Sequence, residues 1–259
     1  MRPHVHGRAS MKAVSRIAAA CFMVALPLLI ITTSVRFFAG EIRFYERGFR
    51  EYDSDQRTGL PLSELDRAAG DVVHYFENDA DTLRIIVNDD GQEVSLYNTR
   101  ETEHMRDVKS VMRFIFRVNE VTLAYVMAYV AAVYLWSGER PLRTLAKQAL
   151  AAMAGGLVVV GAIAVAASLG FDAAWTRFHE IVFRNDLWLL NPATDRLIQM
   201  FPEPFWEEAT FIVGGMIAAQ GIAITVLAAS YLLFSRNGPA VENAPTLLRG
   251  RRISPGRPE

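Results

Sequence analysis

The stretch ATFIVGGMIAAQGIAITVLAASYLLF, residues 209–234, decides the fold class because it contains no charged side chain. A helix needs about 20 predominantly apolar residues to cross the hydrocarbon core of a bilayer. Three further uncharged runs occupy residues 17–35, 121–136 and 148–171. The composition agrees with this pattern, since 51% of the residues are hydrophobic and the net charge is only -1. We therefore predict a membrane α-helical protein with four transmembrane helices.

The first apolar run is predicted to stay in the mature protein as a span. It is too long for the apolar region of a cleaved signal peptide, and no small-x-small cleavage site accompanies it. The letters IAAAC at residues 17–21 resemble a lipoprotein processing site, but the apolar run follows Cys21 instead of preceding it. Since Cys21 is the only cysteine, an intramolecular disulfide and a cysteine metal cluster are both excluded.

Basic residues are distributed unevenly among the segments between the runs. Lysine and arginine close to a span favour the cytoplasmic side of the membrane. They gather in three segments that a four-span arrangement places on one side: Arg2, Arg8, Lys12 and Arg16; Arg140, Arg143 and Lys147; and Arg236, Arg249, Arg251, Arg252 and Arg257. We therefore predict that both termini are cytoplasmic.

This orientation divides the chain into cytoplasmic, membrane and outer segments. The predicted cytoplasmic segments are residues 1–16, a link at 137–147 and a disordered basic tail at 235–259. The predicted transmembrane helices are 17–35, 118–136, 148–171 and 209–234. The two predicted extracytoplasmic segments are a cap with a helix that leads into the second span, 36–117, and an interfacial active-site segment, 172–208.

The larger outer segment is predicted to form a small α+β cap. LSELDRAAGDVVHYFEN, residues 62–78, has the apolar spacing of a helix, with Ser63 as a plausible N-cap and Asp66 three residues later. LRIIVNDDGQEVSLYN, residues 83–98, predicts a β-hairpin whose turn is residues 88–91.

The stretch TRETEHMRDVKSVMRFIFRVNE, residues 99–120, is helical in pattern, and Asn98 or Thr99 can cap it. Lys109, Arg113 and Arg117 recur every fourth residue and form a polar stripe. This stripe either extends toward lipid phosphates or lines a polar cavity. Because the helical pattern continues into the second apolar run, the second span begins before residue 121.

Two constellations carry residues suited to chemistry. In EHMRDVK, residues 103–109, His104 and Asp107 share a helix face, whereas Lys109 is about 140° away from His104 around the helix. The second is FHEIVFRNDLWLLNPATDRLIQMFPEPFW, residues 178–206, in which His179 flanks the apolar face of a predicted interfacial helix. In this stretch Asn191 and Pro192 also predict a helix start, and PEPFW begins the fourth span.

Each histidine also has a purely structural interpretation, because histidines at membrane interfaces commonly hydrogen-bond a carbonyl or a headgroup. His104, His179, Asp107 and Asp186 could meet in space as metal ligands, but HExxH is absent and no metal site is predicted. The G-x-S-x-G elbow of serine hydrolases is absent as well. Neither a glycine-rich phosphate loop nor a basic aromatic nucleic-acid surface occurs, so no nucleic-acid partner is expected.

At HMRDVK (residues 104–109) and at residues 178–206 the sequence resembles the lipoprotein intramolecular transacylase (Lit) family of bacterial membrane proteins. The resemblance covers the layout of four spans, an outer cap and a second outer segment. It implies an acyltransferase of the bacterial cytoplasmic membrane, without a cofactor, that acts on the N-terminus of a diacylated lipoprotein. The sn-2 acyl chain would pass from its ester to the α-amino group of the lipidated cysteine, giving a lyso-form lipoprotein. The implied catalytic pair is His104 and His179.

The residues available fit this chemistry. The substrate supplies the nucleophile, and an α-amine with a pKa near 8 needs a base such as histidine, while a second histidine can protonate the departing glycerol oxygen. Candidates for orienting an imidazole or holding the oxyanion are Asp107, Lys109, Arg113, Asn185, Asp186 and Trp188. Candidates for a lipid-facing wall that excludes water are Phe178, Phe183, Trp188, Phe201, Phe205 and Trp206.

Two other functions stay open at this point. The chain could be a non-enzymatic membrane protein that binds lipid or a partner through its cap, or a metal-dependent lipid hydrolase. Membrane phospholipid is an expected contact in all three cases. The sequence leaves the oligomeric state open.

Overall fold

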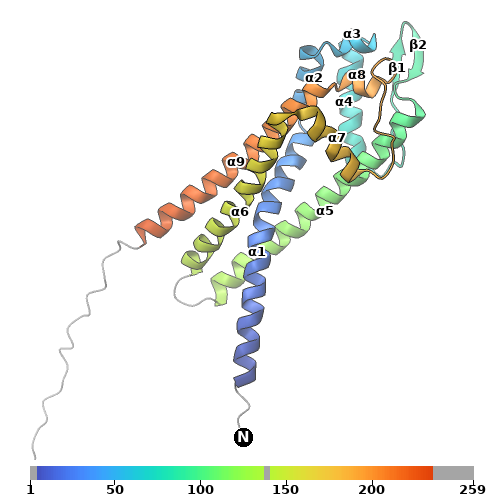
Figure 1. Ribbon diagram of the computed structural model, residues 1–259. Helices are drawn as coiled ribbons and strands as arrows, with labels where there is room; N and C mark the ends of the chain where they lie inside the picture. The colour runs from blue at the N-terminus through green and yellow to red at the C-terminus, as the bar shows by residue number, and fades with distance from the viewer. Residues whose placement is uncertain (1–4, 137–140, 236–259) are drawn as a thin grey trace, which may run out of the picture.

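The structure, a computed structural model, describes residues 5–136 and 141–235. Four long helices form one bundle: α1 (Val5–Ala39), α5 (Thr99–Trp136), α6 (Pro141–Leu169) and α9 (Glu203–Phe234) (Figure 1). Each of the four is long and apolar enough to cross a membrane. The predicted class, a four-span α-helical membrane protein with a small α+β cap, is therefore confirmed.

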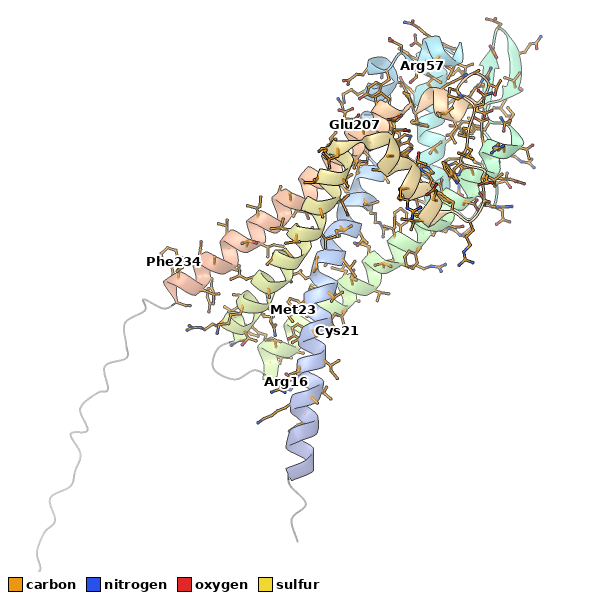
Figure 2. All side chains as sticks on the ribbon, viewed as in Figure 1. Arg16, Cys21, Met23, Arg57, Glu207 and Phe234 are labelled. Atoms are coloured by element: carbon orange, nitrogen blue, oxygen red, sulfur yellow. The ribbon has the colours of Figure 1, made fainter. Side chains whose placement is uncertain are left out.

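The remaining elements gather at one end of the bundle and form the cap (Figure 1). They are the helices α2 (Ile42–Glu51), α3 (Ser54–Thr58), α4 (Leu62–Glu77), α7 (Phe171–Val182) and α8 (Arg196–Met200), and the strands β1 (Ile86–Asp89) and β2 (Gln92–Ser95). In Figure 2, Arg57 and Glu207 lie at the cap end of the molecule, whereas Arg16 and Phe234 lie at the opposite end. The predicted tail at 235–259 lies almost entirely outside the described residues.

Helix α5 is long enough to belong to both parts of the molecule. Its 38 residues correspond to about 57 Å at about 1.5 Å per residue, nearly twice the roughly 30 Å of a bilayer core. The charged half before residue 118 packs against the cap, and the apolar half from 118 onward lies in the bundle (Figure 1). The predicted helix at 99–120 and the second span are thus one continuous helix. Residues 141–147, assigned to a link from the sequence, are helical in α6.

The cap has its own hydrophobic core, which the start of α9 completes. Helix α4 contributes Leu65, Ala68, Ala69, Val72, Tyr75 and Phe76 to it. Phe205 is fully buried in this core, and its ring packs 4.9 Å from that of Phe44, centroid to centroid. The assignment of Phe205 and Phe201 to a lipid-facing wall is therefore wrong, because both side chains are covered by the cap.

The local predictions for the cap are mostly confirmed, with shifted boundaries. Strands β1 and β2 pair antiparallel, and the turn residues Asp90 and Gly91 both have positive φ, as tight hairpins require. Helix α4 is present, but its N-cap is Pro61, so Ser63 does not cap it. Helix α8 begins at Arg196 with Asp195 as N-cap, so the helix start predicted at Asn191 is also wrong. Helices α2 and α3 were not predicted.

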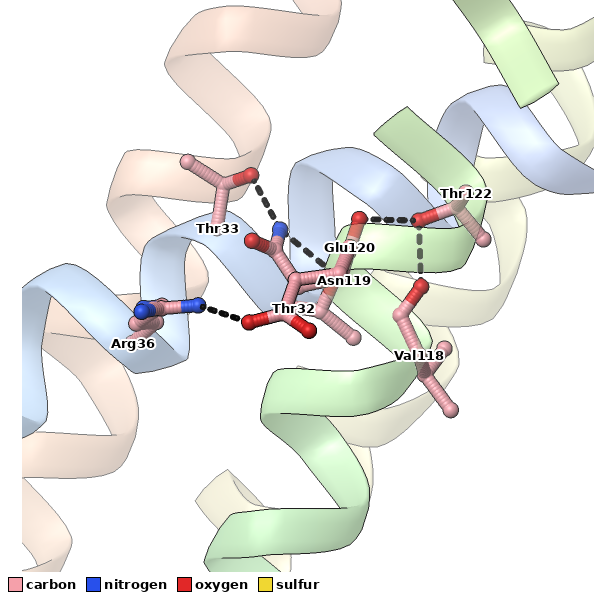
Figure 3. Close-up of polar contacts among 7 residues, drawn as sticks. All are labelled: Thr32, Thr33, Arg36, Val118, Asn119, Glu120 and Thr122. Atoms are coloured by element: carbon pink, nitrogen blue, oxygen red, sulfur yellow. Dashed lines mark hydrogen bonds and ion pairs between the residues drawn. The ribbon is translucent and has the colours of Figure 1, made fainter. Parts of the chain in front are cut away.

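Polar side chains join α1 to α5 within the bundle and at its surface. The Asn119 amide of α5 donates to the hydroxyls of Thr32, at 3.2 Å, and Thr33, at 2.7 Å, and Arg36 pairs with Glu120 (Figure 3). Such bonds between helices fix their relative orientation where lipid offers no competing partner.

Candidate active site

The structure brings the two histidine motifs together in the cap. His104 lies in α5 and His179 in α7, and their ring centroids are 6.1 Å apart. Only 7% of His104 and 8% of His179 is exposed, so both imidazoles are withdrawn from bulk water. This pairing of residues from distant parts of the chain is the centre of the site.

Aromatic side chains surround His179 and hold α7 against the start of α9. Trp175 stacks on Trp206 at 5.2 Å, centroid to centroid, which fixes one side of α7. The ring of Trp188 lies 5.0 Å from that of His179, and the ring of Phe183 lies 5.5 Å from it. The histidine is therefore enclosed by α7 and by the segment that follows it.

The tautomer of His179 follows from a hydrogen bond to the backbone of α7. Its Nδ1 lies 2.8 Å from the carbonyl oxygen of Trp175, one turn earlier in α7. Because a carbonyl can only accept, Nδ1 carries the hydrogen and the neutral ring presents the lone pair of Nε2. Burial lowers the pKa of His179, and the bond to Trp175 partly opposes this. His179 is thus a neutral imidazole whose Nε2 can accept a proton.

His104 differs because one of its nitrogens has no partner. Within the described residues, its Nδ1 is buried and makes no hydrogen bond. The ring meets Phe183 edge-on at 5.1 Å. Burial, and then the proximity of His179, lowers the pKa of His104 to about 4, while Asp107 opposes the shift. A buried polar atom without a partner is costly in a folded protein, so this nitrogen is suited to a group that arrives with the substrate.

Asp107 and Asn185 connect the two motifs directly. The Asn185 amide donates to the Asp107 carboxylate at 2.8 Å. Arg100 adds two bonds, to the backbone carbonyls of Asp186 and Leu187. Asp107 and the backbone of Asp186 therefore join α5 to the segment that follows α7. In the part of the chain that is described, neither the Asp107 nor the Asp186 carboxylate is hydrogen-bonded to an imidazole.

Lys109 and Arg113 point away from the histidine pair, toward the C-terminal end of α4. The Lys109 ammonium donates to the Asn78 side chain and the Ala80 carbonyl, and it lies 3.9 Å from the centroid of the Tyr75 ring. Arg113 donates to the Asn78 carbonyl. Both cations thus stabilise the negative end of the α4 dipole. This differs from both uses predicted for the stripe, contact with lipid phosphates or the lining of a cavity.

The other residues predicted for a lipid-facing wall differ in their exposure. Phe178 is 43% exposed. Phe183 is half-buried beside the two histidines, and Trp206 is half-buried beside Trp175. Among the described residues, no group of three or more His, Cys, Asp or Glu side chains is placed to hold a metal ion.

Sequence inspection missed the residues that fasten the segment after α7 to α5. Glu101 is buried, and its carboxylate accepts hydrogen bonds from the backbone N–H groups of Asn98 and Leu197. The Asn98 side-chain amide also donates to the Asp195 carboxylate. The spacing of Asn98 and Glu101 is that of a capping box, and this signal could have been found. The hydrogen bond from Leu197 to Glu101 joins residues far apart in the chain, so no local sequence pattern predicts it.

Comparison with known proteins adds a family and a fold. A sequence model of the family described as lipoprotein intramolecular transacylase Lit matches residues 20–206. The chain is similar to the in meso structure of the membrane integral lipoprotein intramolecular transacylase Lit from Bacillus cereus, with a TM-score of 0.72 and 17% identity over 87% of this chain and 99% of that one.

Two further structures of the Bacillus cereus protein, with a histidine changed to arginine or to alanine, both have a TM-score of 0.69 and 16% identity. They cover 89% of this chain and 97% and 99% of theirs, respectively. At these sequence identities the structural similarity shows a shared fold alone. No curated protein matches the sequence.

Proposed function

The chain belongs to the lipoprotein intramolecular transacylase (Lit) family of membrane acyltransferases, and from this premise we propose that His104 and His179 carry out its acyl transfer. The substrate is a lipoprotein whose N-terminal cysteine bears a diacylglyceryl group. The sn-2 acyl chain moves from the glycerol oxygen to the cysteine α-amino group, and the product is a lyso-form lipoprotein. The observation that carries this proposal is the buried histidine pair, 6.1 Å apart between ring centroids.

The reaction needs one proton to travel from nitrogen to oxygen. The amine nitrogen forms a bond to the acyl carbon, the ester C–O bond breaks, and the proton lost by the amine must reach the glycerol oxygen. His179 Nε2 is the acceptor that the Trp175 hydrogen bond leaves available. His104, whose Nδ1 is buried without a partner among the described residues, gives a proton to the departing glycerol oxygen. It regains a proton from the protonated His179, so both imidazoles end the reaction neutral. No serine or cysteine of the enzyme is required, because the nucleophile belongs to the substrate.

The surroundings of the pair serve two further needs of the reaction. The tetrahedral oxyanion needs a donor, and the Trp188 indole, whose ring lies 5.0 Å from that of His179, is the donor we favour among the candidates. Asn185 already donates to Asp107, and Lys109 and Arg113 bind the end of α4. Water must be kept out so that the ester is transferred and not hydrolysed. Phe183 lies against both imidazoles and provides that protection.

The position of the site suits a membrane-bound substrate. The pair lies in the cap, next to the half-exposed ring of Phe178, so an acyl chain can reach it from the adjacent leaflet. With the basic segments inside, both termini are cytoplasmic and the cap faces the outside of the bacterial cytoplasmic membrane. Phospholipid surrounds the bundle, and lipoprotein N-termini enter at the edge of the cap.

The decisive experiment incubates the purified protein with a synthetic diacylated lipopeptide and analyses the products by mass spectrometry. Transacylase activity leaves the mass unchanged and moves one acyl chain to the amine, which fragmentation detects. A lipid hydrolase would release free fatty acid, and a binding protein would leave the lipopeptide as it was. Either of these two outcomes would overturn the proposed reaction.

A further inference from the structure

A buried carboxylate lies between the two motifs, and the acid–base pair does not use it. Glu101 is only 1% exposed, although it precedes His104 by a single turn of α5 and most glutamates lie at the surface. Burying a carboxylate costs free energy unless hydrogen bonds compensate the loss of water. The hydrogen-bond partners of the Glu101 carboxylate therefore indicate its role in the cap.

Each oxygen of the Glu101 carboxylate accepts one backbone N–H group, and the two groups belong to different segments. Oε2 accepts from Asn98 at 2.7 Å, while the Asn98 side chain accepts from the Glu101 backbone at 3.1 Å, so the two residues cap the start of α5. Oε1 accepts from Leu197 at 2.6 Å, in the first turn of α8. One carboxylate thus fastens the start of α8 to the start of the His104 helix.

Neighbouring contacts strengthen the same junction. The Asn98 amide donates to Asp195 at 3.0 Å, and the other oxygen of Asp195 accepts from the Asn191 backbone at 2.7 Å. Arg196 forms an ion pair with Asp89 of the hairpin at 2.6 Å. The segment that carries Phe183 and Trp188 is therefore held at its far end by residues of α5 and β1.

We propose that Glu101 is a positioning residue for the acyl transfer. By holding the start of α8 on α5, it keeps Trp188 and Phe183 packed on His179 and keeps His179 facing His104. The role in the reaction rests on the proposed function of the two histidines. Glu101 itself does not touch them. Its loss should lower kcat more than it changes KM, because a shift of about 1 Å in a catalytic group can cost roughly 10²-fold in rate.

The sharpest variant is Glu101→Gln. The amide keeps the shape of the side chain, but one of its ends is an NH₂ group that would face a backbone N–H, so only one of the two bonds survives. Glu103→Gln is the matched control, since Glu103 is exposed in the same turn of α5 and loses the same charge. We expect Glu101→Gln to lower kcat by about 10- to 100-fold and Glu103→Gln to leave it within about twofold.

A distance measurement tests the positioning without any activity. Spin labels are placed at Ser110→Cys in α5 and at Ala193→Cys before α8, in a Cys21→Ala background, and both sites are exposed. The distance between the two labels measures how firmly the start of α8 is held on α5. In Glu101→Gln this distance distribution should broaden, while the distribution between Ser110→Cys and Glu77→Cys, across α4 and α5, stays narrow. Asp195→Asn, which weakens the same junction from the other side, should give a smaller change in the same direction.

The outcomes separate this proposal from the proposed function. A broadened junction in Glu101→Gln would support the positioning role even if the histidines proved not to be catalytic. If Glu101→Gln keeps full activity and the distance distribution between residues 110 and 193 is unchanged, the positioning role of Glu101 is overturned. Equal broadening of both label pairs would also overturn it, because Glu101 would then support the whole cap. If Glu101→Gln does not fold, the same measurements on Asp195→Asn decide the question.

Discussion

The amide nitrogen of Asn185 lies 2.8 Å from the carboxylate of Asp107, and this bond closes the gap between the two motifs at the histidine site. Asp107 shares a face of α5 with His104, so the contact places the chain after α7 over that face. Together with Glu101, which holds the start of α8, it fastens the segment from residue 185 to 197 at both ends. The imidazole pair therefore depends on the packing of the segment after α7 against the start of α5.

We predict that the pH dependence of kcat/KM follows the ionisation of the substrate amine and not that of a histidine with the ordinary pKa. Burial lowers the pKa of His179, and it lowers that of His104 from 6.5 to about 4. Both rings are then mostly neutral at pH 7, and His104 stays neutral as the pH falls through 6.5. The α-amine loses its proton only near pH 8. The rate should therefore rise with pH to about 8 and level off above it.

The measurement is kcat/KM for the lipopeptide between about pH 5 and 9.5, around the amine pKa. A lipopeptide with a fluorinated cysteine, whose amine has a lower pKa, provides the control, because the rising limb should move down with the amine. A limb centred on 6.5, the ordinary histidine value, that does not move with the substrate would refute the prediction.

Removal of metal ions should leave the activity unchanged. The proposed proton transfers use two imidazoles and the substrate amine, and the described residues offer no cluster of three metal-binding side chains. Activity should survive extensive dialysis against a chelator, and elemental analysis should find far less than one zinc per chain. Loss of activity that a single added metal restores would favour the metal-dependent hydrolase.

Gly48→Ala should destabilise the cap. A methyl group at this position would lie 2.6 Å from the ring of Phe205, which is fully buried. Overpacking of this kind costs about 1–3 kcal/mol, so the thermal unfolding temperature in detergent should fall. Gly70→Ala in α4 is the control, because its methyl group meets nothing within 4 Å and alanine favours a helix by roughly 0.5–1 kcal/mol. Equal stability of the two variants would show that Phe205 is not packed as described.

Cysteines at Glu93 and Ala193 should react with a membrane-impermeant thiol reagent on intact cells when Cys21 is replaced by alanine. Both positions are exposed, one in the hairpin and one in the turn before α8. Lys147→Cys, at the opposite end of the bundle, should react only after lysis. The reverse labelling pattern would place the cap in the cytoplasm, where lipoprotein N-termini are not available.

The fold could be predicted from the sequence because its main determinants are local. Four uncharged runs identify the spans, and the alternation around Asn88–Gly91 identifies the hairpin. Phe205 was misplaced because an aromatic residue beside a span can face either lipid or a cap, and only the packing of α2 on α9 distinguishes the two. The short helices α2 and α3 were missed for the same reason, since tertiary contacts stabilise them.

The site was predictable to a smaller extent. Helix geometry separated Lys109 from His104, but it could not show that Lys109 binds the end of α4. The pairing of His104 with His179 came from the family resemblance, because periodicity gives no distance between residues so far apart in the chain. Glu101 escaped notice because the partner of its second oxygen, Leu197, follows it by 96 residues.

We predict that His104 and His179 act as one catalytic unit. Acid–base groups contribute about 10²- to 10⁴-fold each, so His104→Ala and His179→Ala should each lower production of the lyso-form by at least about 100-fold. The double variant should be little worse than the poorer single variant, as expected for residues that serve one proton transfer. The measurement is the initial rate of acyl migration in a synthetic lipopeptide.

The controls are Asp107→Asn and Lys109→Ala. Asp107→Asn removes a charge beside His104 but keeps an oxygen that can accept the Asn185 amide, so we expect a smaller loss of rate. Lys109→Ala should act through stability, because its ammonium binds the end of α4 and not the histidine site. Near-normal conversion by a folded His104→Ala protein would remove His104 from the mechanism. The same result for His179→Ala would leave α7 only the role of an interfacial anchor.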